Sequence, residues 1–236
     1  MKYLALATDY DGTLARDGRV TERTVNALER LGATGREILM VTGRQLEDLL
    51  RIFPQAERFA RIVAENGAVV FDPATRNHVI LTEPPSPLFL DKLREREVPF
   101  SVGRGIVATR RPHEVAILQI IRELGLELQV VFNKGAVMVL PSGVNKSSGL
   151  LAALAQLGIA ADAVVGVGDA ENDHAFLAAC GFGVAVANAL PSLKERADLV
   201  TVGDHGDGVV ELIDRMIADD LGGLEKQVAM KNRLSS

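Results

Sequence analysis

The sequence contains little cysteine and histidine, and the few such residues are scattered. Its single cysteine, Cys180, excludes an intramolecular disulfide bond and a cysteine-rich zinc site, and indicates a reducing compartment. Within Leu-Ala-Ala-Cys-Gly, we expect Cys180 to be a small buried hydrophobic residue. The four histidines, at positions 78, 113, 174 and 205, do not indicate a metal site built from several imidazoles.

Long apolar runs and an excess of positive charge are also missing. No apolar stretch approaches the roughly 18 residues that a membrane span needs. The apolar segment after Lys2 stops at Asp9 and is too short for a signal peptide, so we expect a cytoplasmic protein without a membrane partner. The formal net charge of −5 argues against nucleic-acid binding, because a phosphate backbone favours clustered Lys and Arg. It still allows a small phosphorylated substrate, which needs only a local positive site.

Strand and helix patterns alternate over most of the 236 residues, which predicts an α/β fold with a doubly wound, mainly parallel sheet. Apolar runs typical of buried parallel strands occur at residues 3–8, 37–41, 61–64 and 163–167. Asn66-Gly67 is a strong turn signal, so residues 68–71 and 78–81 are expected to form a hairpin or meander that interrupts the alternation.

The Pro-rich connector at residues 83–87 is the best candidate for a domain boundary. After it, the pattern predicts a helix at 88–97, an interrupted strand at 100–109, a second helix at 112–124, and two further strands at 127–132 and 136–140. In the second helix, Val115, Leu118 and Ile121 are in phase. We therefore expect a small inserted α+β domain at 83–141, a core formed by 1–82 and 142–218, and a tail at 219–236. The tail shows little periodicity and is interpreted as a frayed helix, a linker or disorder.

The first strand leads into two aspartates, Asp9 and Asp11, followed at once by Gly12 and Thr13. Alternate residues of an extended segment share a face, so both carboxylates can point at one substrate. Paired carboxylates at a strand end suit a Mg²⁺ ion and a reaction that needs one nucleophile and one acid. The alternative interpretation is an ordinary strand followed by an Asp-Gly turn.

Other polar residues follow at further strand ends or crossovers, and ligands of open α/β sheets bind beyond the carboxyl ends of strands. They are Thr42 with Gly43, Lys146, and Asp169 with Asn172 and Asp173. Each has an ordinary alternative, respectively a capping hydroxyl, a solvated lysine and a capped helix start. Lys146 is the least ordinary, because a helix N-terminus is unfavourable for a cation. The order of the whole set along the chain favours a functional interpretation.

Together these motifs resemble the haloacid dehalogenase (HAD) superfamily of phosphohydrolases. Residues 9–14, Asp-Tyr-Asp-Gly-Thr-Leu, resemble its motif I; motifs II, III and IV are matched by Val-Thr-Gly-Arg at 41–44, by Lys146, and by Gly-Asp-Ala-Glu-Asn-Asp at 168–173. Glu-Asn-Gly at 65–67, Val-Ala-Asn-Ala at 186–189 and Asp-Gly-Val at 207–209 are similar to landmarks of the Cof-like branch. That branch inserts a cap domain between motifs II and III, which matches residues 83–141. The small cap resembles those of archaeal-type phosphoglycolate phosphatases and related sugar phosphatases.

The resemblance implies a Rossmann-like core and a Mg²⁺-dependent phosphatase that hydrolyses a small phosphorylated metabolite, phosphoglycolate or a sugar phosphate, through an aspartyl-phosphate. Asp9 would be the nucleophile and Asp11 the general acid–base. The implied metal ligands are Asp9, Asp11 through its main-chain carbonyl, Asp169 and Asp173; the implied phosphate contacts are Thr42, Gly43, Lys146 and Asn172. Relatives that preserve the phosphoenzyme, such as ion-pumping ATPases, carry Thr in place of Asp11, so Asp11 favours hydrolysis.

In the cap, the candidates for contacting a substrate carboxylate or sugar hydroxyls are Arg104, Arg110 and Lys134, with Arg111 and His113 as further possibilities. A phosphosugar mutase of the same superfamily is the alternative enzyme. A non-catalytic, phosphate-responsive module of a larger protein is the alternative from another class. A dinucleotide-binding oxidoreductase lacks support, because no Gly-x-Gly-x-x-Gly follows the first strand. We expect a monomer or a homodimer.

Overall fold

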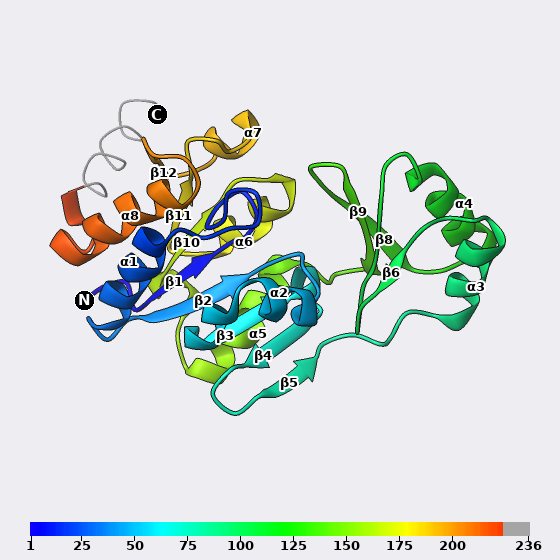
Figure 1. The fold of residues 1–236 in the computed structure, drawn as a ribbon, viewed down its shortest axis with the longest axis horizontal. Helices are drawn as coiled ribbons and strands as arrows, with labels where there is room; N and C mark the ends of the chain where they lie inside the picture. The colour runs from blue at the N-terminus through cyan, green and yellow to red at the C-terminus, as the bar shows by residue number, and fades with distance from the viewer. Residues whose placement is uncertain (224–236) are drawn as a thin grey trace.

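The computed structural model describes residues 1–223, which form an eight-stranded main sheet and a separate four-stranded sheet (Figure 1). The main sheet has the strand order β12-β11-β10-β1-β2-β3-β4-β5. Its strands are β1 (Ala5–Thr8), β2 (Glu37–Val41), β3 (Arg61–Ala64), β4 (Val69–Asp72), β5 (Asn77–Ile80), β10 (Val164–Gly168), β11 (Phe182–Ala185) and β12 (Leu199–Val200). Neighbours from β12 to β3 pair in parallel, whereas β4 and β5 are antiparallel additions. The expected mainly parallel sheet with a terminal meander is confirmed.

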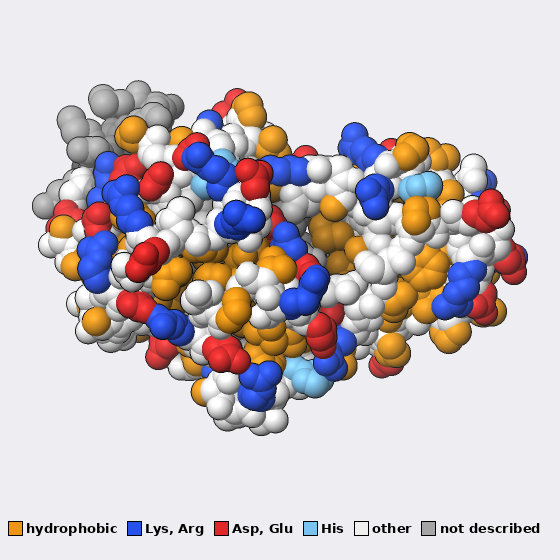
Figure 2. All heavy atoms as spheres, in the orientation of Figure 1, with side chains coloured by type: hydrophobic (Ala, Val, Ile, Leu, Met, Phe, Trp, Pro, Cys, Tyr) orange, Lys and Arg blue, Asp and Glu red, His pale blue; other side chains and the backbone are white. Residues whose placement is uncertain are grey.

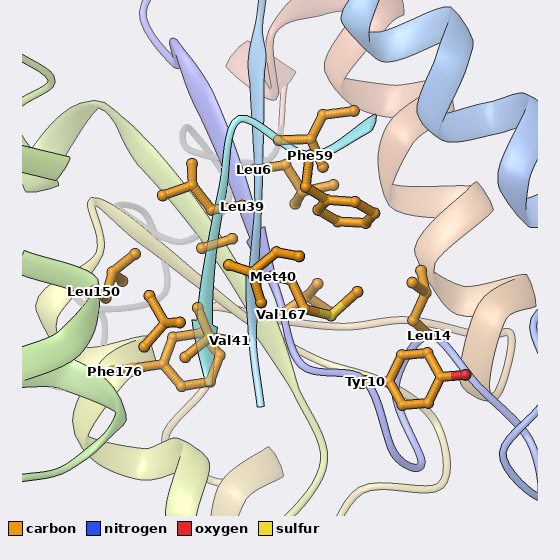
Figure 3. Packing of buried hydrophobic residues seen from close by; sticks show 14 of the residues in the cluster. Leu6, Tyr10, Leu14, Leu39, Met40, Val41, Phe59, Leu150, Val167 and Phe176 are labelled. Carbon is orange, nitrogen blue, oxygen red and sulfur yellow. The ribbon is translucent and has the colours of Figure 1, made fainter. Parts of the chain in front are cut away.

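Helices cover both faces of this sheet. Figure 3 shows α1 (Glu22–Gly32) and α8 (His205–Asp219) on one side of the central strands and α5 (Lys146–Leu157) on the other. Leu6, Leu39, Met40 and Val167 of the central strands are buried between them. The shorter elements are α2 (Leu46–Ile52), α6 (His174–Ala179), α7 (Pro191–Lys194) and the 3₁₀ turns η1 (Pro54–Arg58), η2 (Glu65–Gly67), η3 (Ala161–Ala163) and η4 (Glu171–Asp173). No helix within residues 1–223 is long and apolar enough to cross a membrane.

Local capping explains where the helix that carries Lys146 begins and ends. The Asn145 side chain accepts hydrogen bonds from the backbone N–H groups of Ser147 (2.9 Å) and Ser148 (3.1 Å), and the Ser148 hydroxyl accepts one from the Asn145 backbone N–H (3.0 Å). This capping box satisfies donors that the first helical turn otherwise leaves free. Gly158 ends the helix with a φ of +67°, a conformation that glycine adopts without strain. The cap therefore holds the first helical residue, Lys146, at a fixed place.

The inserted segment folds around its own antiparallel sheet, ordered β6-β7-β9-β8. Its elements are α3 (Pro87–Glu95), β6 (Ser101–Val102), β7 (Val107–Arg110), α4 (Glu114–Leu124), β8 (Leu128–Asn133) and β9 (Ala136–Pro141). Alternate residues of β9 face opposite ways, because Val137 and Val139 pack with the two helices while Met138 and Leu140 join the hydrophobic core of the main domain. One face of the small sheet therefore covers the main domain.

Two expectations for the inserted segment are wrong. Residues 100–109 form two antiparallel strands, β6 and β7, because the chain turns where Gly103 N–H donates to the Ile106 carbonyl at 2.8 Å. Helix α4 buries Ile117 and Ile120, whereas Val115 and Leu118 are 60% and 53% exposed. Apolar residues occupy two adjacent faces of α4, so periodicity alone could not identify the face that meets the sheet. Most of the expected tail, residues 224–236, lies outside the described residues.

Candidate active site

Three acidic residues meet at the carboxyl edge of the main sheet. Strand β1 pairs in parallel with β10, so Asp9, which follows β1, lies beside Asp169, which follows β10. Asp173 comes from η4 immediately afterwards. Carboxylate oxygens of the three residues lie within 4.8 Å of one another, and all three residues are buried. We call these residues the carboxylate cluster.

Two lysines from different parts of the chain bind this cluster. The fully buried Lys146 donates from Nζ to Oδ1 of Asp9 and to Oδ1 of Asp173, each at 2.5 Å. Lys134, from the turn between β8 and β9, donates to Oδ2 of Asp169. Buried charges are tolerated when they are paired and hydrogen-bonded. Three carboxylates nevertheless face two ammonium groups here, which leaves an excess of negative charge.

Burial and mutual repulsion shift the ionisation of the cluster. Burial raises the pKa of Asp9 well above its usual range; Lys146 acts to lower it, and the nearby Asp173 and Asp169 raise it further. Burial likewise raises the pKa of Asp169, against the hydrogen bond from Lys134. Burial acts to lower the pKa of Lys146, but Asp173 and Asp9 outweigh it and raise that pKa above its ordinary value. The lysine is therefore a permanent cation in the site.

Backbone groups and small residues fix the shape of the cluster. Asp173 Oδ2 accepts hydrogen bonds from the backbone N–H of Asp169 (2.8 Å) and of Ala170 (2.9 Å). The Thr13 hydroxyl donates to Asp169 Oδ1 at 2.9 Å. Gly12 has a φ of +87°, and a Cβ there would overlap the Asp169 carboxylate. A side chain at position 12 would therefore displace a member of the cluster.

Asp11 has a different partner from Asp9. Strand β1 ends at Thr8, so the alternation of an extended strand does not continue to residue 11. The Asp11 carboxylate accepts two hydrogen bonds from the Arg44 guanidinium, from Nε at 2.6 Å and from Nη2 at 2.8 Å. Its side chain is 36% exposed, against 3% for Asp9. Asp9 thus lies inside the cluster and Asp11 lies at its solvent side.

Three of the expected phosphate contacts lie near one another. The Thr42 hydroxyl accepts from the backbone N–H of Arg44 at 3.1 Å, and a Cβ on Gly43 would lie 3.7 Å from Asn172 Nδ2. Asn172 donates from Nδ2 to Oδ1 of Asn66 at 3.0 Å. Its own Oδ1 is buried and has no hydrogen-bond partner within residues 1–223. An unpartnered buried oxygen is uncommon in proteins, and this one is free to accept a hydrogen bond from a ligand.

A cleft separates this edge of the main domain from the small sheet. A cavity of about 530 Å³ is lined on one side by residues 43–45, 47, 48 and 51 and on the other by Ser101 and Ala108. Figure 2 shows a hollow between the two parts of the molecule, with Lys and Arg side chains along its margin. Met138, on the adjoining face of the small sheet, lies close to Gly43, since its Sδ would be 3.2 Å from a Cβ there.

The polar candidates of the inserted segment lie in different surroundings. Lys134 reaches the carboxylate cluster. Arg104 instead donates to Glu47 Oε1 at 2.6 Å and lies 2.8 Å from His78 Nε2, at the junction with the main domain. Arg110 is exposed and pairs with Ala136 in the sheet register, at the same end as the Lys134 turn. Of the further candidates, Arg111 lies over the Phe132 ring at 5.1 Å, and His113 is the residue immediately before α4.

Two residues of the matched landmarks have contacts that the motif pattern did not indicate. Asn188 donates to the Gly12 carbonyl at 2.7 Å and accepts from the His205 backbone N–H at 2.7 Å, which ties motif I to the start of α8. The fully buried Glu65 accepts from two backbone N–H groups of the small sheet. Both residues stand in turns that follow strands. Apart from this position and the landmark matches, the sequence offered no signal for these contacts.

The donor set fits a divalent metal ion. All candidate ligand atoms are carboxylate oxygens, which hard cations such as Mg²⁺ prefer. The excess negative charge and the unpartnered Asn172 oxygen both favour an added cation or a ligand in this place. The cluster Asp9, Asp169 and Asp173 is therefore suited to a metal site.

The doubly wound sheet, the carboxylate cluster at its carboxyl edge and the antiparallel insert define a capped α/β protein with a candidate metal site. A family model of haloacid dehalogenase-like hydrolases matches residues 6–105 and 90–213, and the chain belongs to this family. Within it, the chain has the arrangement of the Cof-like branch and is similar to archaeal-type phosphoglycolate phosphatases.

Relatives cover nearly the whole chain. The phosphoglycolate phosphatase of Methanothermobacter thermautotrophicus is 33% identical over 228 residues, which are 90% of this chain and 98% of that protein. The phosphoglycolate phosphatase of Archaeoglobus fulgidus is 31% identical over 216 residues, covering 89% and 95%. A haloacid dehalogenase-like hydrolase from Bacteroides thetaiotaomicron has the same fold, with a TM-score of 0.78 at 18% identity over 91% of this chain and 99% of that one.

Proposed function

We propose that this hydrolase is a Mg²⁺-dependent phosphatase for a small phosphorylated metabolite, with phosphoglycolate as the first candidate and a sugar phosphate as the second. The observation that carries the proposal is the buried Asp9, held by Lys146 at 2.5 Å and faced by Asp169 and Asp173. Support also comes from relatives about one third identical that are named phosphoglycolate phosphatases.

In this proposal Asp9 attacks the phosphorus atom, and the bond from phosphorus to the leaving oxygen breaks as the aspartyl-phosphate forms. Asp11 gives its proton to the leaving oxygen. It then takes a proton from the water that attacks the aspartyl-phosphate, which releases inorganic phosphate and restores Asp9. Arg44 holds the Asp11 carboxylate at the solvent side of the site, where the leaving group and the water would arrive.

The phosphoryl oxygens would be held by Thr42, the backbone N–H of Gly43, Lys146 and Asn172. The unpartnered Oδ1 of Asn172 suits a water or a protonated oxygen of the bound ligand. Preorganised donors of this kind stabilise the charge that spreads over the phosphoryl oxygens in the transition state. Asp9, Asp169, Asp173 and the main-chain carbonyl of Asp11 would hold Mg²⁺, which supplies positive charge against the repulsion between two anions.

We assign residues 1–82 and 142–218 to the catalytic core, 83–141 to the cap and 219–236 to a tail. The cap would close over the leaving group and exclude water. Lys134 already lies at the carboxylate cluster, and its ammonium group would suit the carboxylate of a leaving group such as glycolate. Arg110, at the same end of the cap sheet, is the second candidate for this contact. Arg104, in its pairs with Glu47 and His78, would contribute only after a rearrangement.

A phosphate-release panel tests the proposal. The purified chain is assayed with Mg²⁺ on phosphoglycolate, hexose phosphates, nucleotides and an aryl phosphate, and each assay is repeated with excess EDTA. We expect the highest kcat/KM with phosphoglycolate and loss of turnover with EDTA. No release from any compound would contradict catalysis and favour a phosphate-responsive module. A requirement for a hexose 1,6-bisphosphate would instead favour the mutase.

A further inference from the structure

The turn η2 carries a buried carboxylate that bonds across the junction between core and cap. Glu65 is fully buried; its Oε1 accepts from the backbone N–H of Arg104 at 3.1 Å and its Oε2 from that of Gly105 at 2.9 Å. These donors belong to the turn between β6 and β7. A buried carboxylate is costly unless its oxygens are hydrogen-bonded, and N–H groups left without a partner are costly as well. The buried carboxylate of the core and the two backbone N–H groups of the cap therefore each satisfy the hydrogen-bonding need of the other.

The same turn also contacts the loops assigned to phosphate binding. The backbone N–H of Glu65 donates to the Arg44 carbonyl at 2.8 Å, and that of Asn66 donates to the Thr42 carbonyl at 3.0 Å. Asn66 accepts from Asn172 through its side chain. Glu65 and Asn66 both adopt left-handed conformations, with φ of +53° and +55°, which non-glycine residues rarely do. Strained residues persist where their surroundings hold them, so η2 is fixed by these contacts.

The cap sheet is thus held at two opposite ends. The β6–β7 turn, bound by Glu65, lies at one end of β7, since Val107 pairs with Val139. The β8–β9 turn with Lys134 lies at the other end, where Arg110 pairs with Ala136. The Lys134 side chain, which bonds to Asp169 of the core, is 45% exposed, whereas Glu65 is fully buried. Of the two ends, the Glu65 end is therefore held by the more deeply buried contact.

We propose that Glu65 is a positioning residue that anchors the cap at its pivot, so that the Lys134 end closes in register with the phosphate-binding loops. This inference rests on the proposed phosphatase function for its kinetic consequences only. Without the anchor, the cap is no longer held in a fixed position relative to the phosphate-binding loops. The leaving group of a substrate that contacts the cap is then misplaced. A misplacement of about 1 Å can cost about 100-fold in rate. An aryl phosphate, whose leaving group needs little help from the cap, is affected far less.

The test compares Glu65→Gln and Glu65→Ala with Glu123→Gln. Gln keeps one acceptor oxygen and the shape of the side chain, whereas Ala removes both bonds. Glu123→Gln is the matched control, because it weakens an exposed ion pair to Arg96 within the cap, and neither residue lines the cleft. We expect kcat/KM for phosphoglycolate to fall about 10- to 100-fold in Glu65→Ala and by an intermediate factor in Glu65→Gln. The aryl phosphate should lose less than about threefold, and Glu123→Gln should behave like the parent.

Hydrogen exchange provides a readout that does not depend on activity. The amide protons of Arg104 and Gly105 are the ones bound by Glu65, so the exchange of both should accelerate at least about 10-fold in Glu65→Ala. It should accelerate at one of the two in Glu65→Gln, which keeps one acceptor oxygen, and remain unchanged in Glu123→Gln. Unchanged exchange in Glu65→Ala would overturn the anchor. Equal kinetic losses on both substrates would overturn its role in positioning the cap. If the parent hydrolyses nothing, the proposed function fails, while the exchange experiment still decides whether Glu65 holds the cap.

Discussion

The carboxylate cluster of the core and the polar residues of the cap are held in different ways. Asp9, Lys146 and Asp169 are each buried and each is bonded to side chains from distant parts of the chain. Cap residues stand at strand ends or turns with much of the side chain in solvent; Lys134 is 45% exposed and Arg104 is 35% exposed. Only Lys134, among the three cap candidates, contacts the cluster.

In the proposed function, this difference separates the core residues, which perform the chemistry, from the cap residues, which select the substrate. The core residues follow directly from the ends of parallel strands and the start of a capped helix, so the fold itself fixes their positions. The place of a cap residue depends on how far a hairpin extends and how the whole small domain is oriented. Substitutions in the core should therefore affect every substrate, whereas those in the cap should affect substrates unequally.

Asp9→Asn should have the largest effect and the same effect on all substrates. We expect turnover to fall by about 10⁴-fold or more, because the amide cannot act as the nucleophile. Asn has nearly the same shape, and Lys146 keeps its bond to Asp173, so the fold should persist. The measurement is phosphate release, with thermal unfolding as the control for folding. Residual activity above one hundredth of the parent would refute the assignment of the nucleophile.

Asp11→Asn should reduce activity by about 10²- to 10⁴-fold, and by less when the leaving group is a weak base. The reason is that an aryl oxide departs without a proton, whereas an alkoxide needs one. The ratio of kcat/KM for phosphoglycolate and an aryl phosphate measures this difference, because kcat/KM reports the steps up to formation of the aspartyl-phosphate. Arg44 retains Asp48 as a partner at 2.6 Å, which limits disturbance of the loop. Equal losses on the two substrates would exclude Asp11 as the acid.

Much of the core site could be predicted from the sequence because its determinants are local. The apolar runs predicted the limits of β2 and β3. Parallel pairing then brings the ends of the strands to one edge, so the meeting of Asp9 with Asp169 followed from the order of the strands.

The rest could not be predicted because its determinants are distant or ambiguous. Glu65 stands inside an Asn-Gly turn, and its partner Arg104 lies 39 residues further along the chain. The buried face of α4 depends on the sheet beneath it, since both Val115 and Ile117 suit an apolar stripe. The short strands β6 and β7 have too few residues for a period to distinguish two strands from one with a glycine interruption.

Lys134→Ala should reduce kcat/KM about 10-fold for phosphoglycolate and change little for an aryl phosphate, because a charge-assisted hydrogen bond contributes about 1.5–3 kcal/mol. Most of the loss should appear in KM if the lysine contacts the leaving group in the ground state. Lys92→Ala is the matched control, since Lys92 is another cap lysine and pairs with Glu95 on the surface of α3. A loss of equal size on both substrates would mean that Lys134 acts through its contact with Asp169 and does not contact the leaving group.

Asp220→Asn should give the smallest effect, confined to the stability of the core. The nearly buried Arg36 donates to Asp220 Oδ1 at 2.9 Å and to the Met216 carbonyl at 3.1 Å, which ties β2 to the end of α8. Burial acts to raise the pKa of Asp220, but Arg36 and the backbone N–H of Lys2 outweigh it and hold that pKa below its ordinary value. The carboxylate therefore stabilises the fold above the unfolded pKa of about 3.9, and this contribution is lost as the pH falls through the lower folded pKa.

The variant should accordingly lower the free energy of unfolding by at most about 1 kcal/mol at pH 7, and its deficit relative to the parent should shrink as the pH falls below about 4. Urea unfolding at several pH values measures both quantities. Hydrogen exchange should accelerate at the Arg36 end of the core and remain unchanged in the cap, since the cap has its own hydrophobic cluster. A deficit independent of pH would mean that the lost packing of Asp220, and not its charge, stabilises the core. Faster exchange throughout the cap would mean that core and cap open as one cooperative unit, and the unequal response expected of cap substitutions would then need another cause.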